Sequence, residues 1–241
     1  MFRPTLRLAL AASLFSLPAL AAESPIQLGL ALRTGYSLTK QDNLNANLLG
    51  LGVSGDYALG TDLALRGELA YFYTPGRTYR ADLQAPATGQ TAPDPLRSAD
   101  TRKNKLEGLV LRFSAIRAIQ SGWSLQGGLQ VGNSRFTQEY VGNTINSSRS
   151  YQDTYNGVPT KSALSLSPFA GLQYDVDRDG ALELNLIGQS YKAIDFRHTP
   201  GAPLVSGDPA KSGSHLVYAG DHLEEQSRIR LAVEFSYRFR F

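Results

Sequence analysis

Hydrophobic residues recur at every second position in eight segments of the chain. In the last of them, residues 229–241 (IRLAVEFSYRFRF), every odd-numbered residue is apolar, and Arg230, Glu234 and Arg238 stand among the others. Successive side chains of a β-strand point to opposite faces, so such a segment has one apolar and one polar face. The pattern predicts eight amphipathic strands, at residues 26–36, 49–57, 63–73, 109–115, 123–131, 164–174, 182–189 and 229–241.

The connections between these segments alternate in length. Short turns (ALGTD, AIQSG and DVDRDG) follow the second, fourth and sixth segments, and SLTKQDNLNAN, of intermediate length, follows the first. Long polar connections occupy residues 74–105, 133–162 and 192–226. Short turns at one end and long loops at the other are typical of transmembrane β-barrels, where the turns are periplasmic and the loops extracellular.

Aromatic residues on the apolar face gather at both ends of the predicted strands. Those at the short-turn end are Tyr57, Trp123, Tyr174, Phe239 and Phe241, and those at the long-loop end are Tyr36, Tyr71 and Tyr73. Amphipathic rings favour the two membrane interfaces and form girdles there. We therefore predict an all-β protein, an antiparallel up-and-down transmembrane β-barrel of eight strands.

The N-terminus has the features of a secretory signal peptide. Arg3 and Arg7 precede an apolar stretch that is too short to span a membrane as a helix, and an Ala-Leu-Ala cleavage site ends at Ala21. We expect a signal peptide at residues 1–21 and one barrel domain at residues 22–241. Losing two arginines from a net charge of +3 leaves the mature chain almost neutral, which gives no indication of nucleic-acid binding, and the absence of cysteine excludes disulfides.

With the signal peptide and the eight segments, the whole chain resembles the small Gram-negative outer-membrane β-barrels of the OmpA-transmembrane, OmpX and opacity-protein type. Its apolar C-terminal face, with Tyr237, Phe239 and Phe241, resembles the signal by which the barrel-assembly machinery recognises that family. The resemblance implies a monomer of the outer membrane, in contact with lipid and lipopolysaccharide and without a cofactor.

The polar face of the strands must point into the barrel. The opposite register would place arginines in hydrocarbon, at about 2 to 4 kcal/mol for each one at the midplane. Eight strands enclose only enough space for side chains, and buried charges require partners. We predict an interior plug of paired charges formed by Arg33, Asp56, Arg66, Glu68, Arg112, Glu183, Arg230 and Glu234. A gated path for protons or ions is the alternative reading of these residues.

Three further groups are weaker candidates for a site. Arg102, Lys103 and Lys105 could bind lipopolysaccharide phosphates or form an ordinary solvated charge run. The segment DVDRDG begins like a calcium loop, but the required glutamate is replaced by Leu186, so we expect a turn without a metal. All three histidines, His198, His215 and His222, fall in the last long loop, where we expect them to be solvated.

These observations favour a structural or surface-interaction role, exercised through long extracellular loops that bind a ligand the sequence does not identify. A narrow pore for small solutes is an alternative. A lipid A-modifying enzyme is a third possibility, but the sequence shows no constellation of catalytic residues, because each histidine lacks the His-x-Ser spacing of the deacylase type. We expect a protein that is not an enzyme.

Overall fold

The structure, a computed structural model, describes residues 26–84, 97–145, 152–199, 202–206 and 217–241. The predicted signal peptide and His215 lie outside these ranges. The strands are β1 (Ile26–Ser37), β2 (Asn47–Ala58), β3 (Leu63–Gln84), β4 (Arg97–Gln120), β5 (Trp123–Ile145), β6 (Gln152–Gly157), β7 (Thr160–Asp175), β8 (Gly180–Arg197), β9 (Leu204–Ser206), β10 (Val217–Tyr218) and β11 (His222–Arg240).

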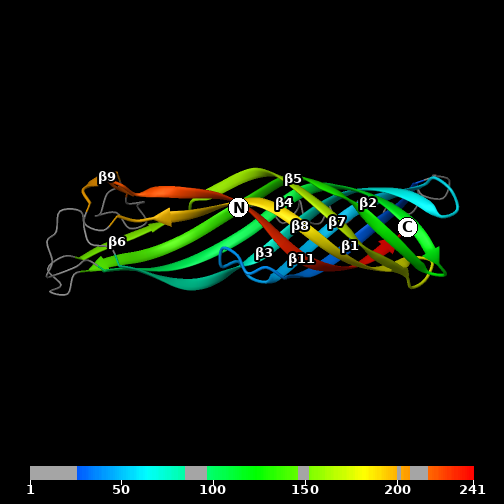
Figure 1. The fold of residues 1–241 in the computed structure, drawn as a ribbon, viewed down its shortest axis with the longest axis horizontal. Coiled ribbons are helices and arrows are strands. Elements are labelled where there is room, and N and C mark those ends of the chain that lie inside the picture. The colour runs from blue at the N-terminus through cyan, green and yellow to red at the C-terminus, as the bar shows by residue number, and fades with distance from the viewer. Residues whose placement is uncertain (1–25, 85–96, 146–151, 200–201, 207–216) are drawn as a thin grey trace, which may run out of the picture.

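Eight of these strands form a closed antiparallel barrel (Figure 1). Each pairs with its neighbour in the order β1, β2, β3, β4, β5, β7, β8, β11, and β11 pairs with β1 to complete the ring. The C-terminus closes against the first strand, where the Phe241 amide donates to the Leu28 carbonyl at 3.0 Å. The predicted eight-stranded antiparallel barrel is confirmed, and closure leaves the ring without an unpaired edge strand.

The side chains alternate between the two faces of the wall as the sequence predicts. On β4, Phe113 is 57% exposed on the outside, whereas the adjacent Arg112 is 3% exposed on the inside. An exterior of large apolar side chains is the surface that a transmembrane barrel presents to lipid. The predicted girdle residues Tyr36, Tyr57 and Trp123 are among the exposed aromatics. None of the described residues forms a helix long and apolar enough to cross a membrane.

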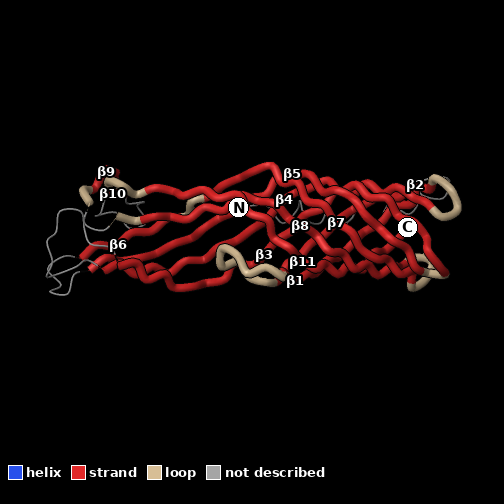
Figure 2. The backbone as a smooth tube through the Cα atoms, in the orientation of Figure 1, coloured by secondary structure: helices blue, strands red, loops and turns tan. Residues whose placement is uncertain are grey.

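The described parts of the long polar segments are mostly β-strand, which corrects the prediction of long loops there. β3, β4 and β5 contain 22, 24 and 23 residues, and β8 and β11 extend as far as Arg197 and His222. Figure 2 shows strand over most of the length of the described chain. The predicted loop ranges 74–105, 133–162 and 192–226 therefore contain paired strands. Interstrand hydrogen bonds join backbone groups, so a polar sequence extends the ladder wherever its partner continues beside it.

Short turns at residues 59–62, 121–122 and 176–179 join the strands at one end, which we call the short-turn end. The other is the long-strand end. Between them, the β3–β4 register shifts between Thr74 and Arg77, where Pro75 and Gly76 interrupt the ladder. Proline lacks the amide that a ladder needs, so a bulge forms at this position. Beyond the barrel, β6 pairs with the end of β5, and β9 pairs with β10.

The barrel interior changes in character along its length. Charged side chains fill the short-turn half, and above them lies a cluster of buried apolar side chains: Leu44, Ala70, Phe72, Leu106, Val110, Phe136, Tyr191, Ala193 and Ile194. The sequence-based prediction of a polar interior missed this apolar layer. The sequence did contain an indication of this layer, because the large apolar residues Phe72, Leu106 and Phe136 occupy inward-facing positions of their strands.

Candidate functional site

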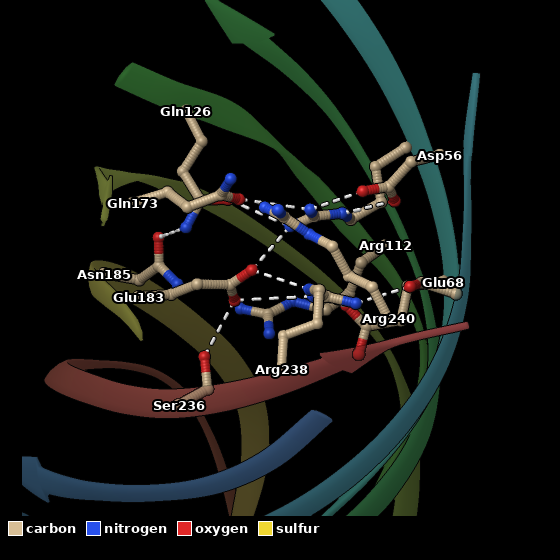
Figure 3. A network of polar contacts seen from close by, with 12 residues as sticks. Asp56, Glu68, Arg112, Gln126, Gln173, Glu183, Asn185, Ser236, Arg238 and Arg240 are labelled. Atoms are coloured by element: carbon tan, nitrogen blue, oxygen red, sulfur yellow. Dashed lines mark hydrogen bonds and ion pairs between the residues drawn. The ribbon is translucent and has the colours of Figure 1, made fainter. Parts of the chain in front are cut away.

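Arg238 of β11 lies at the centre of the charged half of the interior (Figure 3). Its Nε donates to Oε1 of Glu183 at 2.7 Å, and its Nη2 lies 3.2 Å from Oε2 of Glu68. Its Nη1 also donates to the hydroxyl of Ser54. One guanidinium group therefore joins β11 to β2, β3 and β8.

Arg66 of β3 forms the second centre. Its Nε and Nη2 donate to the two carboxylate oxygens of Asp56 at 2.7 and 2.6 Å, and its Nη1 donates to Glu183 at 2.6 Å. The side-chain oxygens of Gln126 on β5 and Gln173 on β7 accept further hydrogen bonds from the same guanidinium group. Bidentate pairs of this kind are both strong and directional.

The remaining charges connect β1, β3, β4 and β11. Arg33 of β1 pairs with Glu68, and its Nε lies 3.3 Å from Oε1 of Glu234. Arg112 of β4 donates to the same Glu234 oxygen at 2.8 Å and lies 4.6 Å above the ring centre of Phe169. The network thus has a member on each of the eight barrel strands. It matches four guanidinium groups (Arg33, Arg66, Arg112 and Arg238) with four carboxylates (Asp56, Glu68, Glu183 and Glu234).

Seven of the eight residues predicted for the charge network occupy it. Arg230 does not: it is buried inside the barrel as predicted, but it donates to Thr74 and to the carbonyls of Asn45 and Ala46. Arg230 lies nearer the long-strand end, opposite neutral acceptors, so the prediction that it is charge-paired is wrong. Arg238 takes the place that Arg230 was expected to fill. Its inward parity in the C-terminal strand was visible in the sequence.

A polar cup opens above the apolar layer at the long-strand end. It has a volume of about 350 Å³, and its lining includes Asp42, Tyr79, Arg102, Arg197, Glu224 and Arg228. Arg197 donates to Glu224 at 2.9 Å, and the Nε of Arg228 lies 3.4 Å from Asp42. The cup therefore presents guanidinium and carboxylate groups together, the chemistry that binds a ligand carrying both charges or many hydroxyl groups.

Arg102 belongs to the floor of this cup, so the prediction that it contacts lipopolysaccharide is wrong. It is buried, and it pairs with Asp100 at 2.5 Å and with Asp195. Burial lowers the pKa of Arg102, but the hydrogen bond and the negative charge of Asp100 outweigh that effect and hold the pKa above its ordinary value. Alternation explains the error, because Arg102 faces the interior when Lys103 and Lys105 face outward.

Lys103 and Lys105 lie on the outer face of β4 as predicted, half-buried beyond the apolar band. Lys105 pairs with Glu139 on β5. Their contact with lipopolysaccharide remains a prediction.

His198 is not solvated, which corrects the prediction for the last long loop. Its Nδ1 lies 3.1 Å from Asp221 Oδ1, and its Nε2 lies 3.1 Å from the hydroxyl of Thr144. Its ring stacks on Tyr155 with centroids 4.0 Å apart. This order of groups resembles the relay of a hydrolase, but Thr144 is fully buried, so its hydroxyl offers a substrate no approach. His222 is exposed, as expected.

Two predicted groups remain, the C-terminal aromatic residues and the segment DVDRDG. Phe239 and Phe241 are exposed on the outer face beside the short-turn end, and Tyr237 packs edge-on against Phe239 at 4.7 Å. In the segment DVDRDG, the Asp179 amide donates to the Asp177 side chain, as in a turn, and Leu186 faces outward. Within the described residues, no group of His, Asp and Glu has the arrangement of a metal site.

Comparison with known proteins finds no matching family model and no matching curated relative. Among solved structures, the chain is similar to Ail, the attachment invasion locus protein of Yersinia pestis, with 12% identity and a TM-score of 0.38, covering 90% of this chain and 96% of that one. It is also similar to a major outer membrane protein of Thermus thermophilus, with 12% identity and a TM-score of 0.40, covering 90% and 99%.

A third similar structure is the N-terminal β-barrel domain of OprF from Pseudomonas aeruginosa, with 12% identity and a TM-score of 0.34, covering 89% of this chain and 97% of that one. At this level of identity and TM-score, the function of the chain has to be argued from its own residues.

Proposed function

We propose that the protein is a closed, non-conducting barrel of the bacterial outer membrane that presents a rigid surface structure to the outside of the cell. The observation that carries this proposal is the charge network inside the barrel. Four guanidinium groups and four carboxylates engage side chains from every barrel strand. Because these opposite charges pair across the interior, an ion would have to break several charge-assisted contacts to pass.

The apolar layer supports the same proposal. It lies between the network and the cup and includes Phe72, Leu106 and Phe136, which are buried against one another. A hydrated ion would lose its water on entering this layer without gaining polar partners. The barrel interior thus has two successive barriers of different chemistry, and this favours a plug over the narrow pore.

The outer-membrane location is supported by the apolar exterior, the closed barrel and the predicted signal peptide at residues 1–21. We place the long-strand end outside the cell and the short-turn end in the periplasm. The polar outer faces of β3, β4 and β5 then stand above the membrane as a paired sheet. A sheet loses less conformational entropy on binding than loops do, so it suits a contact surface.

We assign the contact with outside molecules to the cup. Arg197 and Arg228 are its partly exposed cations, while Asp42 and Glu224 are the adjacent acceptors. A polar surface glycan or a zwitterionic group matches this lining. The proposal includes no catalysis, since the best-ordered hydroxyl–histidine pair, Thr144 and His198, is buried.

Two measurements test the proposal. In planar bilayers, the purified protein should show only brief, small current fluctuations, and a stable channel of about a nanosiemens or more would overturn the closed state. Nanodiscs carrying the protein should bind components of glycan arrays, and Arg197→Gln/Arg228→Gln should weaken that binding. The control is Arg178→Gln in the exposed short turn. Equal binding by all three proteins would remove the cup from the proposal.

A further inference from the structure

The barrel wall contains an interruption between β7 and β8. β7 pairs with β5 from Thr160 to Tyr174, but with β8 its ladder runs only from Phe169 to Asp175. The ladder stops where Pro168 faces Gly188. Proline has no amide hydrogen to donate, so strand pairing ends readily at such a position.

Serine hydroxyls bridge the two strands just beyond the end of the ladder. The Ser190 hydroxyl donates to the Leu166 carbonyl at 2.9 Å and accepts from the Leu166 amide at 2.8 Å. In return, the Ser165 hydroxyl donates to the Ser190 carbonyl at 2.7 Å, and the Ser190 amide donates to Ser167 at 3.2 Å. Serine side chains thus stand between the strands here, and the backbone amide and carbonyl groups of Leu166 and Ser190 remain satisfied.

A hollow of about 670 Å³ lies beyond this bridge, toward the long-strand end. We call it the seam hollow; it is lined by residues 161–164, 190–192 and 227–229. Its lining includes Tyr191, which belongs to the apolar layer inside the barrel, and Leu164 and Ile229, which face outward. The seam hollow therefore reaches from the outer surface into the wall.

The chemistry of the seam hollow is divided along the barrel axis. Leu164 and Ile229, at 79% and 67%, are the most exposed large apolar side chains among the described residues. The small residues Ala163, Ser190 and Ser227 also line the hollow, as does Arg228, whose guanidinium group pairs with Asp42. Lys161 and Lys192 stand farther toward the long-strand end. An apolar groove that continues into paired cations is complementary to a lipid whose acyl chain ends in an anionic head group.

We propose that the seam hollow binds lipid A, with one acyl chain in the groove between Leu164 and Ile229 and a phosphate held by Lys161 and Lys192. The choice of lipid A over a phospholipid rests on the proposed outer-membrane orientation, in which the long-strand end meets the lipopolysaccharide leaflet. We assign one chain to the groove, where the separated strands let it lie deeper than it could on an intact wall.

Glu225 is the counter-ion of these lysines in the free protein. Its carboxylate lies 2.5 Å from the Lys161 ammonium nitrogen and 4.0 Å from that of Lys192. All three side chains are substantially exposed, and exposed ion pairs of this kind contribute little to stability. A phosphate can therefore replace the carboxylate, and Glu225 weakens the affinity that the lysines would otherwise give.

The test is native mass spectrometry of the full-length mature protein in detergent, titrated with bis-phosphorylated lipid A. The wild type should bind one lipid A. Lys161→Gln/Lys192→Gln and the groove-filling Ser227→Trp should each weaken that binding about tenfold or more, whereas Glu225→Gln should strengthen it. The matched controls are Lys40→Gln, an exposed lysine of the β1–β2 connection, and Thr34→Trp, an outward residue of β1. Circular dichroism and heat-modifiable migration on gels confirm folding of each variant.

The direction of the Glu225→Gln effect separates a specific phosphate site from a general loss of stability, because no destabilised variant should bind more tightly. Unchanged binding in both the lysine and the Ser227 variants would overturn the proposal. Equal competition by phosphatidylglycerol would also overturn it, since the occupant would then be a phospholipid. These results do not depend on conductance or on array binding, so they can fail while the proposed surface role stands.

Discussion

Arg238 of β11 and Glu183 of β8 face one another inside the barrel, with Nε and Oε1 2.7 Å apart and both side chains about 1% exposed. Glu183 also accepts from Arg66 and from the hydroxyl of Ser236. A single carboxylate therefore pairs with two guanidinium groups, and its replacement would disturb β3 as well as the two strands that carry the pair.

Replacing Glu183 with Gln should destabilise the barrel by about 3 to 5 kcal/mol, because it leaves a buried guanidinium charge uncompensated. The variant should unfold at lower urea concentration in lipid vesicles. The control Asp179→Asn, in an exposed turn, should unfold like the wild type. The double variant Arg66→Gln/Glu183→Gln restores the charge balance and should recover part of the loss. A Glu183→Gln barrel as stable as the wild type would contradict the charge-pair account.

Deleting Phe241 should reduce the amount of folded protein in the outer membrane, while synthesis and export continue. Phe241 ends the apolar outer face of β11, and its amide donates to Leu28 on β1, across the junction that closes the barrel. The measurement is heat-modifiable migration of membrane fractions on gels. The matched control is Phe113→Leu, an outward residue far from the closing junction. Wild-type abundance after the deletion would argue against a role in assembly.

Cysteine labelling can determine the orientation, since the chain contains no cysteine of its own. Thr101→Cys, on the exposed outer face of β4 beyond the apolar band, should react with a membrane-impermeant maleimide on intact cells. Asp177→Cys in a short turn should react only after the outer membrane is permeabilised. The reverse result would invert the proposed topology and remove the cup from the cell surface.

Acidification should loosen the cup before it affects the barrel. Hydrogen bonds from Arg197 and Gln226, together with the Arg197 charge, hold the pKa of Glu224 below its ordinary value of 4.5. A depressed pKa in the folded state means that the stabilisation is present above pH 4.5 and is lost as the pH falls through the folded-state pKa. Amide exchange at the paired residues Arg197 and His222 should therefore accelerate, relative to neighbouring residues, in acid below pH 4.5.

In the Glu224→Gln variant, the amides of Arg197 and His222 should exchange at a rate that no longer responds to protonation of residue 224. An identical acid response in the variant and the wild type would show that another group controls the cup rim.

The alternation of apolar and polar residues was sufficient to predict the closed barrel, its apolar exterior and most of its interior charges. Residues such as Phe113 and Arg112 have their faces determined locally, because a strand turns adjacent side chains in opposite directions. In a membrane, only one of the two faces of each strand can be turned toward lipid without placing charged side chains in hydrocarbon. These constraints act within a single strand, so they can be read along the chain.

Which inward residues meet, however, depends on strand stagger and on the height of each side chain in the closed barrel. Arg238 and Arg230 have the same parity on β11, yet only Arg238 reaches Glu68 and Glu183. The burial of His198 against Asp221 and the parting of β7 from β8 at Pro168 likewise depend on neighbouring strands that are distant in sequence. Local periodicity determines the side of the wall on which a residue lies, whereas tertiary packing determines its partner, because pairing requires matching positions along the barrel axis as well as a common face.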